Sequence, residues 1–295
     1  LTEFMEEVFY PAAYRARALV VGFNLPVELT RICADAGEGR KANRGGFSLV
    51  LWAYEDRRGR VVERRFRPRL GLRCLNSKQA FVNFSHPARH KKCEHRPPYY
   101  PGRFLDLRTL VYALTGESHS LASACKVFHV PHGKDEAAEH GVITPAYIGY
   151  NRHDVRATTE LLELVLAEYA RHPLRLDPTK AYSPAAIAKA YLAEMGITPP
   201  AIKFADVPPD LLGNGMTAYF GGRAEARTRK TIVPVVHCDF LSMYPTVNTL
   251  MGLWRFLTAE RILVQDATEE VRTWVMGVTA ERCFEPRFWA DLPVF

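Results

Sequence analysis

The segment Asp239-Phe240-Leu241-Ser242-Met243-Tyr244-Pro245-Thr246 carries the strongest chemical signal in the sequence. It follows an apolar, β-branched run over 231–238, so we expect a strand that ends at Asp239. A carboxylate in that position can bind Mg²⁺ with few protein ligands and leave coordination positions for substrate phosphates. The backbone N–H groups of the turn that follows can face a triphosphate, and Tyr244 can pack beneath a sugar ring. The alternative is an aspartate that only caps a helix beginning near Ser242.

A second segment, Tyr219-Phe220-Gly221-Gly222-Arg223, lies shortly before it. Paired glycines permit the close approach of another backbone or of DNA. The aromatic ring can stack on a base, and Arg223 can bind a phosphate. The simpler interpretation is a Gly-Gly hairpin turn.

Two acids near the start and middle of the chain lie in similar settings. Glu28 follows Asn24 by four residues, just after a short apolar run over 18–23. Asp154 follows Tyr150 by four residues, and positions four apart share one face of a helix. Each pattern also suits a helix start at which an acid interacts with the dipole.

Together these segments resemble family B DNA polymerases. Residues 239–246 are similar to the first palm motif, D-x-x-S-L-Y-P-S, and residues 219–222 to the Y-x-G-G segment between the exonuclease and polymerase parts. Residues 22–28 resemble the second exonuclease motif of DEDD-type nucleases, with Glu28 where the family has Asp. Residues 150–154 match the third motif, Y-x-x-x-D. The four segments occur in the family's order.

The resemblance implies a templated DNA polymerase with a 3′–5′ proofreading exonuclease and two Mg²⁺ ions per active site, with Mn²⁺ as a substitute. The implied metal ligands are Asp239, Asp154 and Glu28, and Tyr150 would position the attacking water. The implied nucleotide-binding residues are Leu241, Ser242, Met243 and Tyr244, with Tyr244 as the gate against a 2′-hydroxyl. The implied DNA contacts are Asn24, Tyr219, Gly221, Gly222 and Arg223. Glu28 is one methylene longer than Asp, which loosens the geometry that Mg²⁺ demands.

The family's remaining motifs do not occur in the 295 residues: no D-x-E precedes Glu28, and no D-T-D or Lys-rich fingers helix follows Asp239. We therefore expect a fragment cut at both ends that neither polymerises nor degrades DNA by itself. Two alternatives stay open: a catalytically inactive DNA-binding relative, which Glu28 favours, and a free-standing DEDD-type nuclease.

The helices and strands expected to position these residues indicate a mixed α/β (α+β) fold. We expect an RNase-H-like exonuclease domain over 1–172, a connector over 173–225 and the beginning of a polymerase palm over 226–295. Predicted helices span 2–14, 29–36, 120–128, 153–170 and 184–195, with Asn151 capping the fourth and Ser118 or Ser120 the third. Predicted strands span 18–23, 47–54, 61–75 and 104–110, the second and third forming a hairpin and the last leading into a helix. Residues 81–100 are expected to form a loop, and 199–209 an extended connector.

Composition agrees with a DNA-handling protein. The formal net charge is +7 and the isoelectric point about 9.1, which favours anionic partners: primer–template DNA, single-stranded DNA and deoxynucleoside triphosphates. No run of 18 apolar residues occurs, so no membrane association is expected. The six cysteines form no C-x-x-C pair and indicate reduced thiols in a cytoplasm. The resemblance to family B polymerases implies a bacterial, phage or mobile-element setting. Oligomeric state is left open.

Three other features of the sequence lie outside these motifs. Seven arginines surround the hairpin, and Arg65, Arg67 and Arg69 would point together from a strand, towards phosphates or towards water. The segment from His86 to His95 has zinc-ligand residue types in no familiar spacing, so a solvated basic loop is favoured. Asp106 lies on the strand predicted to begin at Phe104, and the resemblance implies a structural role for it.

Overall fold

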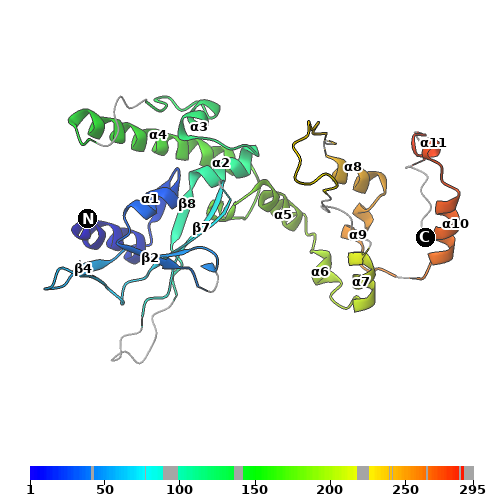
Figure 1. The fold of residues 1–295 in the computed structure, drawn as a ribbon, viewed down its shortest axis with the longest axis horizontal. Helices are drawn as coiled ribbons and strands as arrows, with labels where there is room; N and C mark the ends of the chain where they lie inside the picture. The colour runs from blue at the N-terminus through cyan, green and yellow to red at the C-terminus, as the bar shows by residue number, and fades with distance from the viewer. Residues whose placement is uncertain are drawn as a thin grey trace. The chain divides into compact units, whose positions relative to one another are not determined.

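The structure is a computed structural model. It describes residues 1–40, 43–76, 78–88, 99–135, 142–217, 226–238, 240, 242–263, 265–285 and 287–288. The chain divides into two compact units, Leu1–Glu194 and Met195–Phe295 (Figure 1). Unit 1 mixes helices with strands, which confirms the predicted mixed α/β class at that level.

Two parallel strands in unit 1 position Asn24, Glu28 and Asp106. Strand β1 (Leu19–Gly22) pairs with β8 (Arg103–Asp106), with Gly22 opposite Asp106. Each strand leads into a helix, β1 into α1 (Leu25–Arg31) and β8 into α2 (Leu107–Thr115). Because parallel strands end at the same edge, the residues that follow both strands meet there. The predicted helix over 29–36 is wrong, since the helix begins at Leu25, with Pro26 in its first turn.

Four of the strands that fall between β1 and β8 in the sequence form an antiparallel sheet. Its strands follow the order β2, β3, β6, β7. Their bounds are Asp35–Glu38, Phe47–Val50, Leu70–Asn76 and Gln79–Phe84. The loop predicted over 81–100 is therefore wrong at its start, because residues 81–84 belong to β7 and Phe84 is completely buried. Residues 89–98 lie outside the described part of the chain.

The predicted hairpin is confirmed in a shorter form. Strands β4 (Ala53–Glu55) and β5 (Val61–Glu63) pair antiparallel across a turn in which Asp56 accepts backbone N–H bonds from Arg58 and Arg60. The chain after Glu63 turns instead of continuing as a strand until Leu70.

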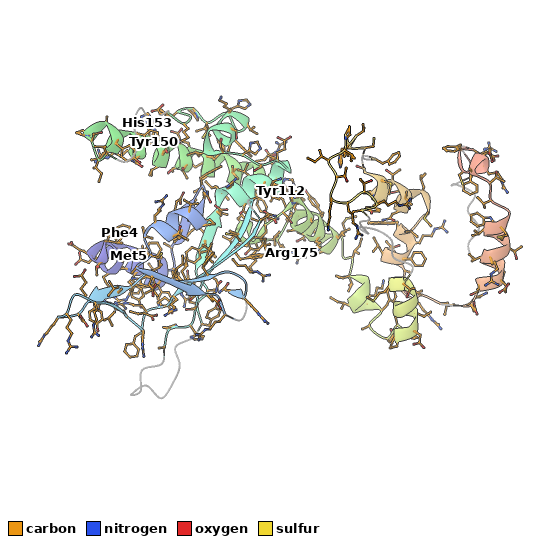
Figure 2. All side chains as sticks on the ribbon, viewed as in Figure 1. Phe4, Met5, Tyr112, Tyr150, His153 and Arg175 are labelled. Atoms are coloured by element: carbon orange, nitrogen blue, oxygen red, sulfur yellow. The ribbon has the colours of Figure 1, made fainter. Side chains whose placement is uncertain are left out.

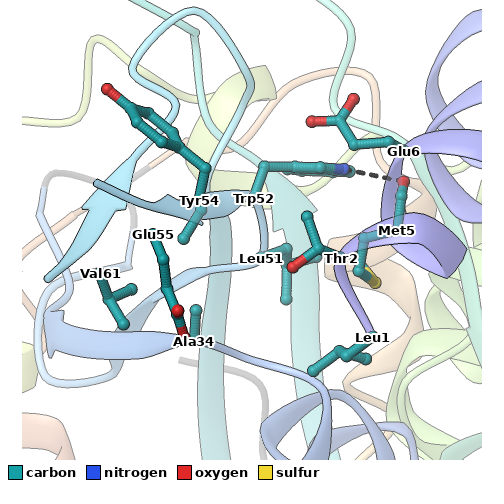
Figure 3. A pocket seen from close by; sticks show the side chains of 11 residues that line it. Leu1, Thr2, Met5, Glu6, Ala34, Leu51, Trp52, Tyr54, Glu55 and Val61 are labelled. Carbon is teal, nitrogen blue, oxygen red and sulfur yellow. Dashed lines mark hydrogen bonds between the residues drawn. The ribbon is translucent and has the colours of Figure 1, made fainter. Parts of the chain in front are cut away.

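The first helix covers the antiparallel sheet. It is a π-helix, η1 (Phe4–Arg15), with Pro11 inside it. Trp52, which is 2% exposed, donates its indole N–H to the carbonyl of Met5 at 3.0 Å (Figure 3). The same residues border a cavity of about 120 Å³. One buried cluster, containing Met5, Leu29, Trp52 and Phe84, joins the helix to the sheet.

The remaining helices of unit 1 pack on a second core. They are α3 (Leu121–Val127), α4 (Pro145–Ala170), the 3₁₀ turn η3 (Pro178–Lys180) and α5 (Pro184–Glu194). Helix α4 contacts α2 and α3. Ser120 caps α3 in a reciprocal capping box with Ser123, which settles the choice between Ser118 and Ser120.

Helix α4 begins earlier than predicted. Thr144 accepts the N–H of Tyr147 as its N-cap, and Pro145 occupies the first position. The predicted cap Asn151 is wrong, since it lies inside the helix and donates to the carbonyl of Tyr147.

The described part of unit 2 contains helices and no strands. They are α6 (Pro200–Lys203), α7 (Pro209–Thr217), α8 (Met243–Leu250), α9 (Trp254–Thr258), α10 (Thr268–Met276) and α11 (Ala280–Cys283). The extended connector predicted over 199–209 is wrong, because α6 and the start of α7 occupy it. The strand predicted over 231–238 is also wrong, because no described segment pairs with these residues.

Within the described residues, no helix combines the length and the apolar character that a membrane crossing requires.

Candidate functional site

The ends of β1 and β8 bring Asn24, Glu28 and Asp106 together. Asp106 accepts the N–H of Leu25, the first residue of α1, at 3.1 Å. Its other oxygen accepts the hydroxyl of Thr109 at 2.6 Å. Because Asp106 lies at the end of β8 and Leu25 follows β1, this carboxylate fastens the start of α1 to the neighbouring strand.

Burial dominates the titration of Asp106. It raises the pKa of this carboxyl to about 6, against the lowering effect of bonds from Thr109 and Leu25, and the charge of Glu28 raises it further. The structural role that we assigned to Asp106 agrees with these contacts.

Glu28 lies back over the end of its own strand. The backbone N–H of Asn24 donates to its carboxylate at 3.3 Å. A Cβ placed on Gly22 would lie only 1.8 Å from a carboxylate oxygen of Glu28, so the side chain occupies space that the glycine leaves free. Burial raises the pKa of Glu28, partly offset by backbone bonds from Asn24 and Phe23. The Glu28 side chain is therefore folded back over the end of β1.

Tyr150 and Asp154 share one face of α4, as their spacing predicts. Lys134 joins them: its ammonium donates to the Tyr150 hydroxyl and to Asp154 Oδ2, each at 2.6 Å. Tyr147 stacks on Tyr150 with 6.0 Å between ring centroids. Figure 2 shows Tyr150 beside His153 on this helix.

Lys134 is the residue of the candidate site that the sequence analysis missed. It lies 16 and 20 residues before its two partners, in a polar stretch without periodicity, so no local pattern points to the contact. Burial lowers the pKa of Lys134, but the bonds to Asp154 and Tyr150 raise it above its usual value. The ammonium therefore stays charged beside the carboxylate.

The two motif segments rest on one hydrophobic core. Phe23, which precedes Asn24, belongs to the same buried cluster as Ala157, one turn beyond Asp154. Leu107 and Leu110 of α2 complete the connection between β8 and α4. The core therefore fixes the strand ends and the middle of α4 within one body.

The residues fit a divalent cation in part. Asp154 Oδ1 is buried, and no donor from the described residues reaches it, so this oxygen is free for a cation. Mg²⁺ needs only one or two carboxylates when water and phosphates complete its shell. Within the described residues, however, no three His, Cys, Asp or Glu side chains gather closely enough to hold a metal ion.

The predicted polymerase residues are only partly described. Asp239, Leu241, Tyr219, Gly221, Gly222 and Arg223 lie outside the described residues. Ser242 precedes α8 with a left-handed φ of 56°. Met243 and Tyr244 are 44% and 58% exposed. The structure therefore offers Tyr244 as an exposed ring on the first turn of α8.

The hairpin arginines are less free than predicted. Glu6 pairs with Arg64 at 3.0 Å and with Arg67 at 2.6 Å. Arg69 pairs with Glu63. Arg65, Arg67 and Arg69 lie between β5 and β6 and not on a strand, so the predicted strand that would align them is wrong. Ion pairs within unit 1 already use two of these three charges.

Comparison with known proteins gives no assignment: no family model, no curated protein and no solved structure matches the chain. Its function must be inferred from its own residues.

Proposed function

We propose that this chain is part of a family-B-like DNA polymerase that adds nucleotides to a primer by two-metal phosphoryl transfer. Residues 1–172 would form an RNase-H-like 3′–5′ exonuclease domain, 173–225 a connector and 226–295 the beginning of the palm. The order of the four sequence motifs supports the proposal. The observation that carries the exonuclease part is the shared core on which both motif segments rest.

In the exonuclease part, Asp154 and Glu28 would hold Mg²⁺ or Mn²⁺, and Tyr150 would orient the attacking water. A bound ion supplies charge stabilisation at the scissile phosphate. Asn24 lies at the turn after β1, beside the acid, where it would meet the 3′ end of single-stranded DNA. Asp106 would act only by fixing the start of α1.

In the polymerase part, the proposal rests on the sequence motif. Asp239 would bind both metal ions, and residues 241–244 would line the incoming deoxynucleoside triphosphate, with Tyr244 excluding a 2′-hydroxyl. The segment 219–223 would contact the template strand. The net charge of +7 suits a long anionic partner.

A DNA-binding relative without chemistry is the second candidate. Two observations favour it: the Lys134 ammonium lies on the carboxylate of Asp154, and the Glu28 side chain bends back over Gly22. Both leave the acids less available to a metal than the family pattern implies. A free-standing nuclease is disfavoured, because it gives the Asp239 segment no role.

The deciding experiment measures primer extension and 3′-end degradation by the full-length protein that contains these residues. We expect Asp239→Ala to abolish extension and leave degradation, and Asp154→Ala to do the reverse. Asp210→Ala, at an exposed acid of α7, is the matched control. Absence of both reactions in the wild type, with DNA affinity retained, would select the non-catalytic candidate.

A further inference from the structure

The segment from Pro131 to Asp135 is fastened to α4 at three points. We call His132, Lys134 and Asp135 the clasp. His132 Nδ1 lies 2.6 Å from Glu160 Oε1, and its backbone N–H donates to the other oxygen of Glu160. Asp135 pairs with His153 at 2.7 Å. The Lys134 contact with Asp154 lies between these two along the segment.

The three contacts differ in their exposure. The side chains of His153 and Asp135 are 47% and 54% exposed, whereas those of Lys134 and Asp154 are 25% and 26% exposed. Ion pairs at exposed positions stabilise a fold only slightly. The outermost pair can therefore open at small cost, while the inner pair is better shielded from water.

The inner pair places a positive charge where a metal ligand is proposed. The Lys134 ammonium reaches both Asp154 Oδ2 and the Tyr150 hydroxyl. Its Nζ also lies 4.8 Å from the centroid of the Tyr150 ring. Like charges repel strongly at such distances in a partly shielded site. A divalent cation on Asp154 and an ammonium on the same carboxylate would therefore compete.

We propose that Lys134 is a built-in cation that occupies Asp154 in place of a divalent metal ion, and that the clasp must release before Asp154 binds Mg²⁺ or Mn²⁺. This inference rests on the proposed function, in which Asp154 is a metal ligand. Lysine suits such a role because its ammonium is a compact point charge on a flexible stem, able to leave the carboxylate without moving the helix. Lys134 then balances the charge of Asp154 until a metal ion replaces it.

Manganese binding to the 295-residue chain tests the proposal. We would titrate Mn²⁺ by calorimetry, without DNA, into the wild type and Lys134→Met, which keeps the apolar stem and removes the charge. We expect Lys134→Met to bind Mn²⁺ roughly tenfold more tightly or better, because one competing charge is gone. The double variant Lys134→Met with Asp154→Asn should lose that gain. Lys126→Met, at an exposed lysine of α3, is the control and should match the wild type.

Circular dichroism and a second neutral variant, Lys134→Gln, guard against misfolding. An unchanged or weakened Mn²⁺ affinity in both neutral variants, with the fold retained, would overturn the proposal. Failure of the proposed function would look different: tighter Mn²⁺ binding at Asp154 in Lys134→Met, but neither extension nor degradation of DNA by the full-length protein.

Discussion

Asp106 and Glu28 are two carboxyl groups at the ends of paired strands, and burial raises the pKa of both. They differ in the groups that donate hydrogen bonds to them. Asp106 receives a backbone N–H and a hydroxyl from two different helices. Among the described residues, Glu28 receives bonds from the backbone of Phe23 and Asn24. Asp106 is therefore the fixed member of the pair, and the Glu28 side chain has more freedom to move towards a ligand.

The raised pKa of Asp106 predicts a pH dependence of stability. The unfolded chain ionises this carboxyl near its ordinary value of 3.8, and the folded chain only near 6. Between these values the folded state binds more protons, so the free energy of unfolding falls as the pH rises from about 4 to about 6. Asp106→Asn should remove this contribution, which amounts to at most about 3 kcal/mol. Urea unfolding at several pH values would measure it.

Asp177→Asn provides a control of opposite sign. The hydroxyl of Thr179 lowers the pKa of Asp177, against the effect of burial, so its contribution is present above about pH 4 and is lost as the pH falls. If Asp106→Asn unfolds with the same dependence on pH as the wild type between pH 4 and 6, the carboxyl is not perturbed by its surroundings.

Some contacts among these residues could be predicted from the sequence and others could not, for a physical reason. The shared face of Tyr150 and Asp154 follows from the helical repeat alone, so it was predictable. The approach of Lys134 depends on how a loop returns to α4, and the bond from Leu25 to Asp106 joins residues 81 positions apart. Neither contact leaves a periodic signal in the sequence.

At the scale of elements, the cap of α3 gives a sharp test. The Ser120 hydroxyl accepts the backbone N–H of Ser123, and the Ser123 hydroxyl accepts the backbone N–H of Ser120. Ser120→Ala should lower the free energy of unfolding of unit 1 by about 1 kcal/mol, since a helix N–H loses its acceptor. Ser118→Ala changes an exposed serine two residues before the cap and should have almost no effect. Equal losses in both variants would show that the capping box contributes nothing.

Elements with their own start signals were predictable, and elements that depend on neighbours were not. The helices α3 and α5 carry a serine cap or a proline at the first position, and both were predicted correctly. The prolines near 200 and 209 were interpreted as breaks, although proline also suits the first turn of a helix, which is where α6 and α7 use it. The run over 231–238 has strand propensity, but a strand also requires a partner.

At the scale of the whole molecule, the buried residues are unevenly distributed. Both hydrophobic clusters belong to unit 1. Beyond Glu194, none of the residues whose exposure the structure describes is buried. Several apolar side chains there are largely exposed, among them Ile232, Val236 and Phe284. Burial of apolar surface is the main force that stabilises a fold. Cooperative stability should therefore reside in unit 1.

Hydrogen exchange on the intact 295-residue chain tests this distribution. Amides in the core of unit 1, such as those of β8 and α2, should exchange only through global or large-scale opening, because their hydrogen bonds are shielded by buried side chains. Amides of α8 and α10 should exchange within seconds to minutes, since short exposed helices open without disturbing any core. Mass spectrometry of peptides from both units gives the comparison within one sample. Protection in α8 or α10 as strong as that in α2 would mean that unit 2 contains a stable core of its own.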